Sequence, residues 1–249
     1  MPSMRASGDK GPRGRPRPGG RATRARPQSG PLPPAPPRII LDADDVREGV
    51  RHLRRRCEVM RMVHDAAGDP PLRRRPAGFA GLARIIVGQQ LSVASASAIW
   101  TRTELLCDPF EPDVMAALDD AKLAGAGLSR PKIRTLRAIC AAVRDGLDLS
   151  RLEASSDAEI QRALTAISGI GPWTADIYIM FCLGRSDGFA AGDLALQIGA
   201  AKALGLKARP SAEELLAIAE RWRPWRGVAA RLLWNYYASL KRADKAAPV

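Results

Sequence analysis

The sequence has few residues of the kinds that bind metals or form disulfides. Its 249 residues include four cysteines and two histidines. The cysteines are Cys57, Cys107, Cys140 and Cys182, and no pair has the spacing of a zinc site, a redox motif or an iron–sulfur run. We therefore expect buried, reduced thiols, no iron–sulfur cluster and a cytoplasmic location, where disulfides are rare.

Long unbroken apolar runs are also missing. The N-terminus has no apolar core of the kind that a secretion signal needs. The densest apolar stretch, residues 163–183, is long enough for a membrane helix, but Gly169, Gly171 and Pro172 interrupt it and Asp176 places a charge in it. The sequence therefore predicts no membrane partner.

Acidic residues are outnumbered by basic ones, 26 to 39, which gives a net charge of +13. Residues 1–38 hold nine basic residues and one acid, Asp9, so the rest of the chain carries about +5. Such a surface favours a polyanion such as nucleic acid, because binding releases condensed counterions. Charge alone leaves a second interpretation open, in which the basic segment only keeps an unrelated enzyme in solution.

The first 38 residues lack aromatic side chains and contain ten prolines and six glycines. A segment of this composition cannot bury enough apolar surface to offset the entropy lost on ordering. We expect a disordered basic tail over residues 1–38 and a folded domain over residues 39–249.

Alternating strand patterns are absent from that domain, and apolar residues recur every three or four positions instead. One such stripe runs from Val46 to Val63 and predicts a single long amphipathic helix. Phe79 opens the next apolar pattern, and Pro131 suits the first turn of a later helix. The sequence therefore predicts an all-α fold.

A short stretch, SGIGPWTAD, separates two of these helical patterns. Ser156 and Glu159 form a capping box that begins the first helix, and Pro172 suits the first turn of the second. Gly169 and Gly171 permit positive φ angles in the turn between them, and amide groups at the start of the second helix can bind an anion such as a DNA phosphate. A plain tight turn between packed helices is the alternative interpretation.

Four separated motifs carry a resemblance to a known family. They are IIVGQQLSVASA, LTAISGIGPWTAD, FAAGDLALQ and RWRPWRGVAARLLWNYY, and they follow one another between Phe79 and Tyr237. In this order they resemble the helix-hairpin-helix DNA glycosylase superfamily, and specifically the 3-methyladenine DNA glycosylase II family of alkylation-repair enzymes. The resemblance implies two helical lobes, about residues 39–78 with 190–249 and about residues 79–189, and an active-site cleft between them for a base extruded from DNA.

The resemblance also implies a catalytic residue. Asp193 takes the position of the family's catalytic aspartate, where a carboxylate stabilises the positive charge that develops on the sugar as the glycosidic bond breaks. An N-cap role for the helix from Leu194 is the alternative, and both roles can coexist. Trp173 stands where strand-cleaving relatives carry a lysine nucleophile, which implies a monofunctional enzyme that leaves an abasic site.

The remaining site residues come from the same motifs. Trp173 and Trp234 match positions in the base pocket, where aromatic faces attract the positive charge of an N3- or N7-methylated purine. Gln90 takes the position of the wedge that fills the hole left in the duplex. The resemblance further implies DNA phosphate contacts from Gly169, Gly171 and Thr174, and a structural monovalent cation held by the backbone carbonyls of Thr165, Ile167 and Ile170.

The sequence therefore predicts a base-excision repair enzyme, a monofunctional DNA-3-methyladenine glycosylase that flips alkylated purines out of damaged double-stranded DNA and hydrolyses them from the sugar. Its expected substrates are lesions of the 3-methyladenine and 7-methylguanine type. We expect a monomer that requires no cofactor and that, in a bacterium, associates with the nucleoid. Two alternatives stay open: a non-catalytic DNA-binding module built on the hairpin, and a glycosylase for deaminated or oxidised bases.

Overall fold

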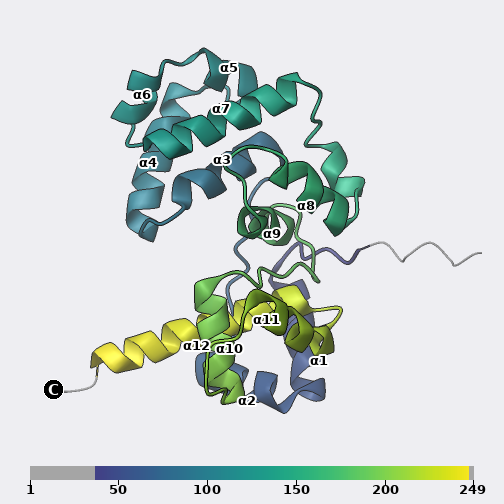
Figure 1. Cartoon of the computed structure of the whole chain (residues 1–249). Coiled ribbons are helices and arrows are strands. Elements are labelled where there is room, and N and C mark those ends of the chain that lie inside the picture. Colours follow the sequence, from purple (N-terminus) through teal and green to yellow (C-terminus); the bar gives the residue numbers. More distant parts are fainter. Residues whose placement is uncertain (1–36, 247–249) are drawn as a thin grey trace, which may run out of the picture. The chain divides into compact units, whose positions relative to one another are not determined.

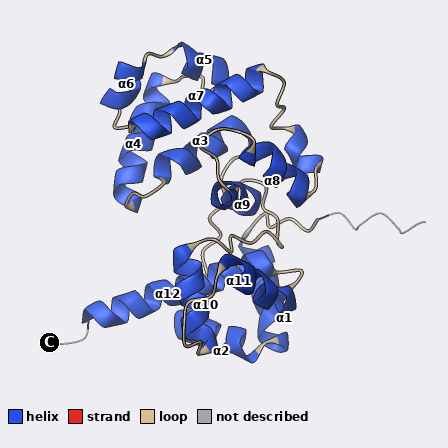
Figure 2. Ribbon diagram, viewed as in Figure 1, coloured by secondary structure: helices blue, strands red, loops and turns tan. Residues whose placement is uncertain are grey.

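The computed structural model describes residues 37–246, and this range is helical (Figure 2). It contains twelve α-helices, two short 3-10 helices and one isolated antiparallel bridge between Ile39 and Arg185. The predicted all-α fold is confirmed for this range. None of its helices combines the length and the apolar character that crossing a bilayer requires.

The helices form two groups, which we call the first and the second lobe (Figure 1). The first lobe joins the beginning and the end of the described range and consists of α1 (Ala43–Arg56), α2 (Glu58–Ala67), α10 (Leu194–Leu204), α11 (Ala212–Ala219), η2 (Glu220–Trp222) and α12 (Arg226–Ala246). The second lobe consists of α3 (Gly78–Gly88), α4 (Val93–Leu106), α5 (Pro112–Ala117), α6 (Asp120–Gly125), α7 (Arg130–Arg144), η1 (Arg151–Ala154), α8 (Asp157–Thr165) and α9 (Pro172–Phe181). In the first lobe α12 packs against α1, α2 and α10, and in the second α3 packs against α4, α7 and α9.

The predicted tail over residues 1–38 lies outside the described residues except for Pro37 and Arg38. Arg38 already belongs to the folded part. Its guanidinium lies 4.8 Å from the ring centre of Trp225 and pairs with Glu48 at 2.5 Å, and its carbonyl accepts the N–H of Ser186 at 2.9 Å. The folded part therefore includes at least one residue that the composition assigned to the tail.

The predicted single helix over residues 46–63 is wrong, because the chain breaks there into α1 and α2. Cys57, between them, has extended backbone angles of φ −141° and ψ 112°. The guanidinium of Arg54 spans the break and donates to the carbonyl of Arg61 at 3.4 Å and to the Asp65 carboxylate. Both helices pack against α12. A one-residue break leaves the spacing of three or four on either side intact, so periodicity alone does not reveal it.

A buried arginine fastens α12 to the end of α9. Arg231 is 2% exposed, and its guanidinium donates to the carbonyls of Met180 at 3.0 Å and Gly227 at 2.7 Å. The guanidinium also lies 4.7 Å from the ring centre of Phe181. Burial lowers the pKa of Arg231 to about 10, which leaves it charged at neutral pH. One cation thus joins the two lobes through carbonyl dipoles and an aromatic face.

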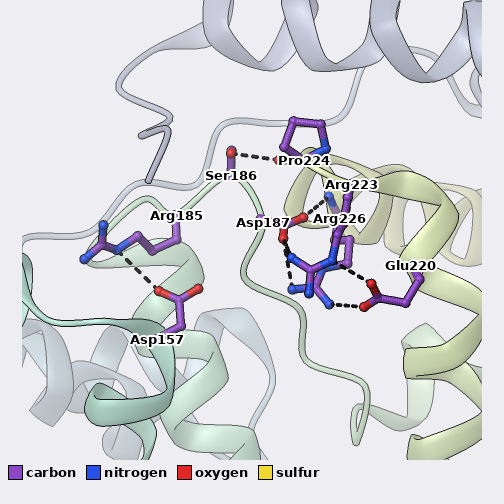
Figure 3. Close-up of polar contacts among 8 residues, drawn as sticks. All are labelled: Asp157, Arg185, Ser186, Asp187, Glu220, Arg223, Pro224 and Arg226. Carbon is purple, nitrogen blue, oxygen red and sulfur yellow. Dashed lines mark hydrogen bonds and ion pairs between the residues drawn. The ribbon is translucent and has the colours of Figure 1, made fainter. Parts of the chain in front are cut away.

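The loop between α9 and α10 is tied to both lobes by ion pairs (Figure 3). The Arg185 side chain, 3% exposed, pairs with Asp157 in the first turn of α8 at 3.5 Å. Further along the loop, Asp187 pairs with Arg226 at 3.0 Å and also with Arg223, both beside the start of α12. Because this loop leads directly into α10, these bonds fix the position from which α10 starts.

Candidate active site

Asp193 is the N-cap of α10, and both of its carboxylate oxygens are hydrogen-bonded. Oδ1 accepts the backbone N–H of Leu196 at 2.9 Å, the bond expected of an N-cap aspartate. The indole Nε1 of Trp234 donates to the same oxygen at 2.8 Å, and Nε1 of Trp173 donates to Oδ2 at 2.8 Å. The N-cap prediction is therefore confirmed, and a tryptophan from each lobe holds the carboxylate in one orientation.

A cavity of about 370 Å³ opens beside Asp193, between the lobes. Its volume is that of a site for a small molecule or a single base. Trp173 and Trp234 both line it, so the structure brings together the three residues that the sequence assigned to catalysis and to the pocket. Phe181 adds a further aromatic wall, with its ring centre 5.8 Å from that of Trp234.

Sequence reasoning missed three polar side chains of this cavity: Arg73, Arg75 and Tyr237. The two arginines belong to the segment that joins α2 to α3, and Tyr237 lies one turn beyond Trp234 on α12. Burial lowers the pKa of Arg75, and the nearby Arg84 and Arg73 guanidiniums act in the same direction. The run of three arginines from Arg73 was the available signal, but charge composition does not say that such a run passes along a cleft.

The hairpin between α8 and α9 requires a glycine at one position only. Gly169 has φ 88°, and a Cβ added to it would overlap the hydroxyl oxygen of Thr135. Gly171 has φ −95° and ψ 173°, and a Cβ there would meet no atom within 4 Å. The prediction of a positive φ at Gly171 is therefore wrong. This residue begins α9 as its N-cap, and extended backbone suits that position.

Backbone donors are available at this hairpin. Within residues 37–246, the N–H groups of Gly169 and Gly171 have no hydrogen-bond acceptor. Gly171 also provides no side chain to cap α9, so the positive end of the helix dipole faces outward without a partner of its own. The hairpin has the local features of an anion site.

Thr174, the third predicted phosphate contact, does not face outward. Its side chain is 3% exposed, its hydroxyl accepts Nε2 of Gln89 at 3.0 Å, and its N–H donates to the carbonyl of Gly171 at 3.0 Å. The structure therefore corrects the prediction that Thr174 contacts DNA directly. Thr174 instead joins the start of α9 to the segment that follows α3.

Gln90, the predicted wedge, lies in that segment and is exposed. Its φ of 57° is uncommon for a residue other than glycine, and it is followed by Leu91, which is 38% exposed. Lys132 of α7 holds the start of this segment in place, because its Nζ donates to the carbonyls of Val87 at 2.7 Å and Gln89 at 2.9 Å. Gln90 is not among the residues that line the cavity of Asp193.

The three carbonyls predicted to hold a monovalent cation flank the hairpin turn. The carbonyl of Ile167 accepts the N–H of Ile170 at 3.0 Å, which leaves one of its lone pairs free. The carbonyls of Thr165 and Ile170 accept no hydrogen bond from the residues that the structure describes. Within the same range, no group of histidine, cysteine or carboxylate side chains has the arrangement of a metal site.

Known proteins are similar to this chain in sequence. Residues 83–224 match the family described as HhH-GPD superfamily base excision DNA repair protein. DNA-3-methyladenine glycosylase 1 of Schizosaccharomyces pombe is 32% identical over 173 residues, covering 68% of this chain and 75% of that protein. A probable bifunctional transcriptional activator/DNA repair enzyme of Mycobacterium tuberculosis is 34% identical over 168 residues, 61% of this chain but 32% of that much longer protein.

Solved structures show the same fold. A DNA-3-methyladenine glycosidase from Bacillus halodurans superposes with a TM-score of 0.68 and 34% identity, covering 78% of this chain and 91% of that one. The 3-methyladenine DNA glycosylase of Schizosaccharomyces pombe, determined in complex with abasic DNA, superposes with a TM-score of 0.68 and 28% identity, covering 75% and 95%.

Proposed function

The chain belongs to the HhH-GPD superfamily of base excision DNA repair proteins, and on that premise we propose that it is a DNA glycosylase that removes alkylated purines from double-stranded DNA. The observation that carries the proposal is the carboxylate of Asp193, held at 2.8 Å by the indoles of Trp173 and Trp234 at the wall of a cavity. The volume of that cavity, about 370 Å³, is enough for one flipped base.

Asp193 supplies the charge that the reaction needs. When the N-glycosidic bond breaks, the bonding electron pair leaves with the base and positive charge develops on the sugar. An ionised carboxylate fixed beside the sugar stabilises this charge, and it also orients the water that adds to C1′. The products are a free base and an abasic site. Because the indole bonds fix the carboxylate before DNA arrives, little reorganisation is needed at the moment of reaction.

The aromatic walls suit the base that leaves. Methylation of a purine at N3 or N7 makes the ring cationic, which weakens its bond to the sugar. The same positive charge is attracted by the faces of Trp173, Phe181 and Trp234. These aromatic faces therefore favour binding of alkylated purines over undamaged ones.

The proposed reaction is monofunctional. Trp173, at the position of the lyase nucleophile, donates its indole N–H to Asp193, and the side chains described as lining the cavity include no lysine. A Schiff base with the sugar needs such an amine. We therefore propose hydrolysis without strand cleavage.

DNA is held by the hairpin in this proposal. The free N–H groups of Gly169 and Gly171 bind a backbone phosphate beside the lesion, and Gln90 enters the space that the flipped nucleotide leaves. Among the residues that the structure describes, no donor bonds to the carbonyls of Thr165 and Ile170, and the carbonyl of Ile167 keeps one lone pair free. Three such hard oxygen atoms fit a monovalent cation. When bound, that cation would bring positive charge to the phosphate contact.

The test is release of free bases from methylated duplex DNA by the purified protein and by Asp193→Asn. Asparagine preserves the N-cap but removes the negative charge, so release of 3-methyladenine and 7-methylguanine is expected to fall by about 10²–10³-fold while DNA binding persists. Asp145→Asn, an exposed change at the end of α7, is the matched control and is expected to keep full activity.

Each alternative has its own outcome. A protein that binds the duplex and releases no base from methylated, deaminated or oxidised DNA is a binding module, and release from deaminated or oxidised DNA alone would redefine the substrate. Borohydride trapping runs in parallel. A covalent adduct with DNA would contradict the monofunctional mechanism.

A further inference from the structure

Two arginines line the cavity of Asp193, and neither has an acidic partner. Within residues 37–246, no carboxylate lies within 4.0 Å of the Arg73 or the Arg75 guanidinium. Asp193 is the single acidic residue among the described side chains that line the cavity, and its oxygens are occupied by N–H donors. The charged side chains around the cavity are therefore two cations and one anion.

The backbone of Arg75 is fixed at this place. Its N–H donates to the carbonyl of Phe181 at 2.9 Å, and the preceding residue, Arg74, donates from Nη1 to the carbonyl of Cys182 at 3.1 Å. The loop segment that carries Arg75 thus lies along the end of α9, the helix that supplies one wall of the cavity. Arg73 has φ 52°, a left-handed backbone conformation that is uncommon for a residue other than glycine.

Arg75 also separates the cavity from a second one. That neighbouring cavity, of about 250 Å³, shares Arg75 and Gly88 with the first and is bordered further by Arg84 and Leu91. Arg84 does not line the cavity of Asp193, and its guanidinium lies 5.3 Å from the ring centre of Trp100. Arg75 and Arg84 thus border the same second cavity, and of these two only Arg75 also lines the cavity of Asp193.

We propose that Arg75 tunes how the base pocket responds to the charge of the flipped base: against the attraction of the aromatic walls for cationic methylated purines, its guanidinium raises the relative rate for neutral purines that present an acceptor atom. This inference rests on the proposed glycosylase function and names a specificity residue within it. The aromatic walls attract a cationic base and Arg75 repels it, so the guanidinium shifts the balance between the two kinds of lesion. A carbonyl oxygen on C6 of a neutral purine can instead accept one of its N–H groups.

The experiment compares two lesions that both carry oxygen on C6. Single-turnover rates of release are measured for 7-methylguanine, which is cationic, and for hypoxanthine, which is neutral, in one duplex sequence, with wild type, Arg75→Met, Arg75→Lys and Arg84→Met. Arg75→Met keeps an unbranched, flexible side chain and removes its charge. It is expected to shift the ratio of the two rates by about tenfold in favour of 7-methylguanine, the size of a partly screened charge interaction at close range.

The other variants separate charge from shape. Arg75→Lys retains the charge and is expected to keep the wild-type ratio within about threefold. Arg84→Met removes a neighbouring charge that does not line the pocket and is expected to leave the ratio unchanged. Thermal unfolding of each variant checks that it is folded.

Two results would overturn the inference. If Arg75→Met slows both lesions by the same factor, the guanidinium binds the phosphate of the flipped nucleotide, which is equally rich in oxygen acceptors, and does not read the base. If wild type releases only 7-methylguanine, Arg75→Met must speed that release, and an equal or lower rate contradicts the inference. Release of neither base by wild type, together with no release of 3-methyladenine from methylated duplex, would instead show that the proposed function itself fails.

Discussion

Replacement of Gly169 by alanine is expected to lower the free energy of unfolding by about 2–5 kcal/mol. Two costs add. A φ of 88° costs an L-residue roughly 1–2 kcal/mol. In addition, the new Cβ would overlap the hydroxyl oxygen of Thr135 and lie 3.1 Å from the Thr135 Cβ, and overpacking of this kind costs roughly 1–3 kcal/mol. For a domain of this size the melting temperature should fall by about 10 °C.

Two more variants separate these costs. Gly171→Ala, with φ −95° and no atom within 4 Å of the new Cβ, should change stability by less than about 1 kcal/mol. Thr135→Ala removes the overlapping oxygen and leaves only the Thr135 Cβ close by, so in its background Gly169→Ala should cost mainly the backbone part, about 1–2 kcal/mol. Urea unfolding of all the variants is the assay. The reasoning would be refuted if Gly169→Ala and Gly171→Ala lowered the free energy of unfolding equally. It would also be refuted if Gly169→Ala cost as much in the Thr135→Ala background as in the wild type.

Three further expectations concern buried side chains. Burial raises the pKa of Asp176 to about 7, so between about pH 4 and pH 7 the folded protein binds a proton that the unfolded chain has lost, and stability falls as pH rises through that window. Asp176→Asn should remove this slope in urea unfolding and stabilise the protein at pH 8 by about 2–4 kcal/mol. Burial raises the pKa of Cys140 to about 11 and of Cys182 to about 12, so mass spectrometry after thiol labelling at pH 8 should find the half-buried Cys57 modified and these two intact. Arg185→Met should cost about 2–4 kcal/mol in thermal unfolding, because its guanidinium, 3% exposed, donates to two carbonyls that would then lack a partner.

Local signals in the sequence predicted local structure well. The capping box of Ser156 and Glu159 begins α8, and α7 begins with Pro131 in its first turn. Asp193 caps α10 through the N–H of Leu196. In each of these cases the residues that decide the structure lie within four positions of one another, so the local sequence is enough to predict where the helix begins.

Features that depend on contacts between distant residues could not be predicted from the sequence. Gly169 and Gly171 look alike in a motif, but only Gly169 packs against Thr135, which lies 34 positions earlier on another helix. Arg75 becomes a pocket residue only because its segment hydrogen-bonds to the end of α9, more than a hundred positions away. Thr174 is likewise turned inward by Gln89. Tertiary packing decides all three, and a pattern of residue types does not contain it.

The hydrogen bond between Gln89 and Thr174 has a mechanical consequence. This bond joins the segment of Gln90 to α9, the second helix of the hairpin. Two bonds from Lys132 to the carbonyls of Val87 and Gln89 hold the same segment against α7, so the segment and the hairpin form one unit. In the proposed enzyme, the distance between the hairpin and Gln90 is therefore the same at every DNA site that the protein binds. The deformation falls on the DNA instead, and the base pairs weakened by damage are those that give way most readily.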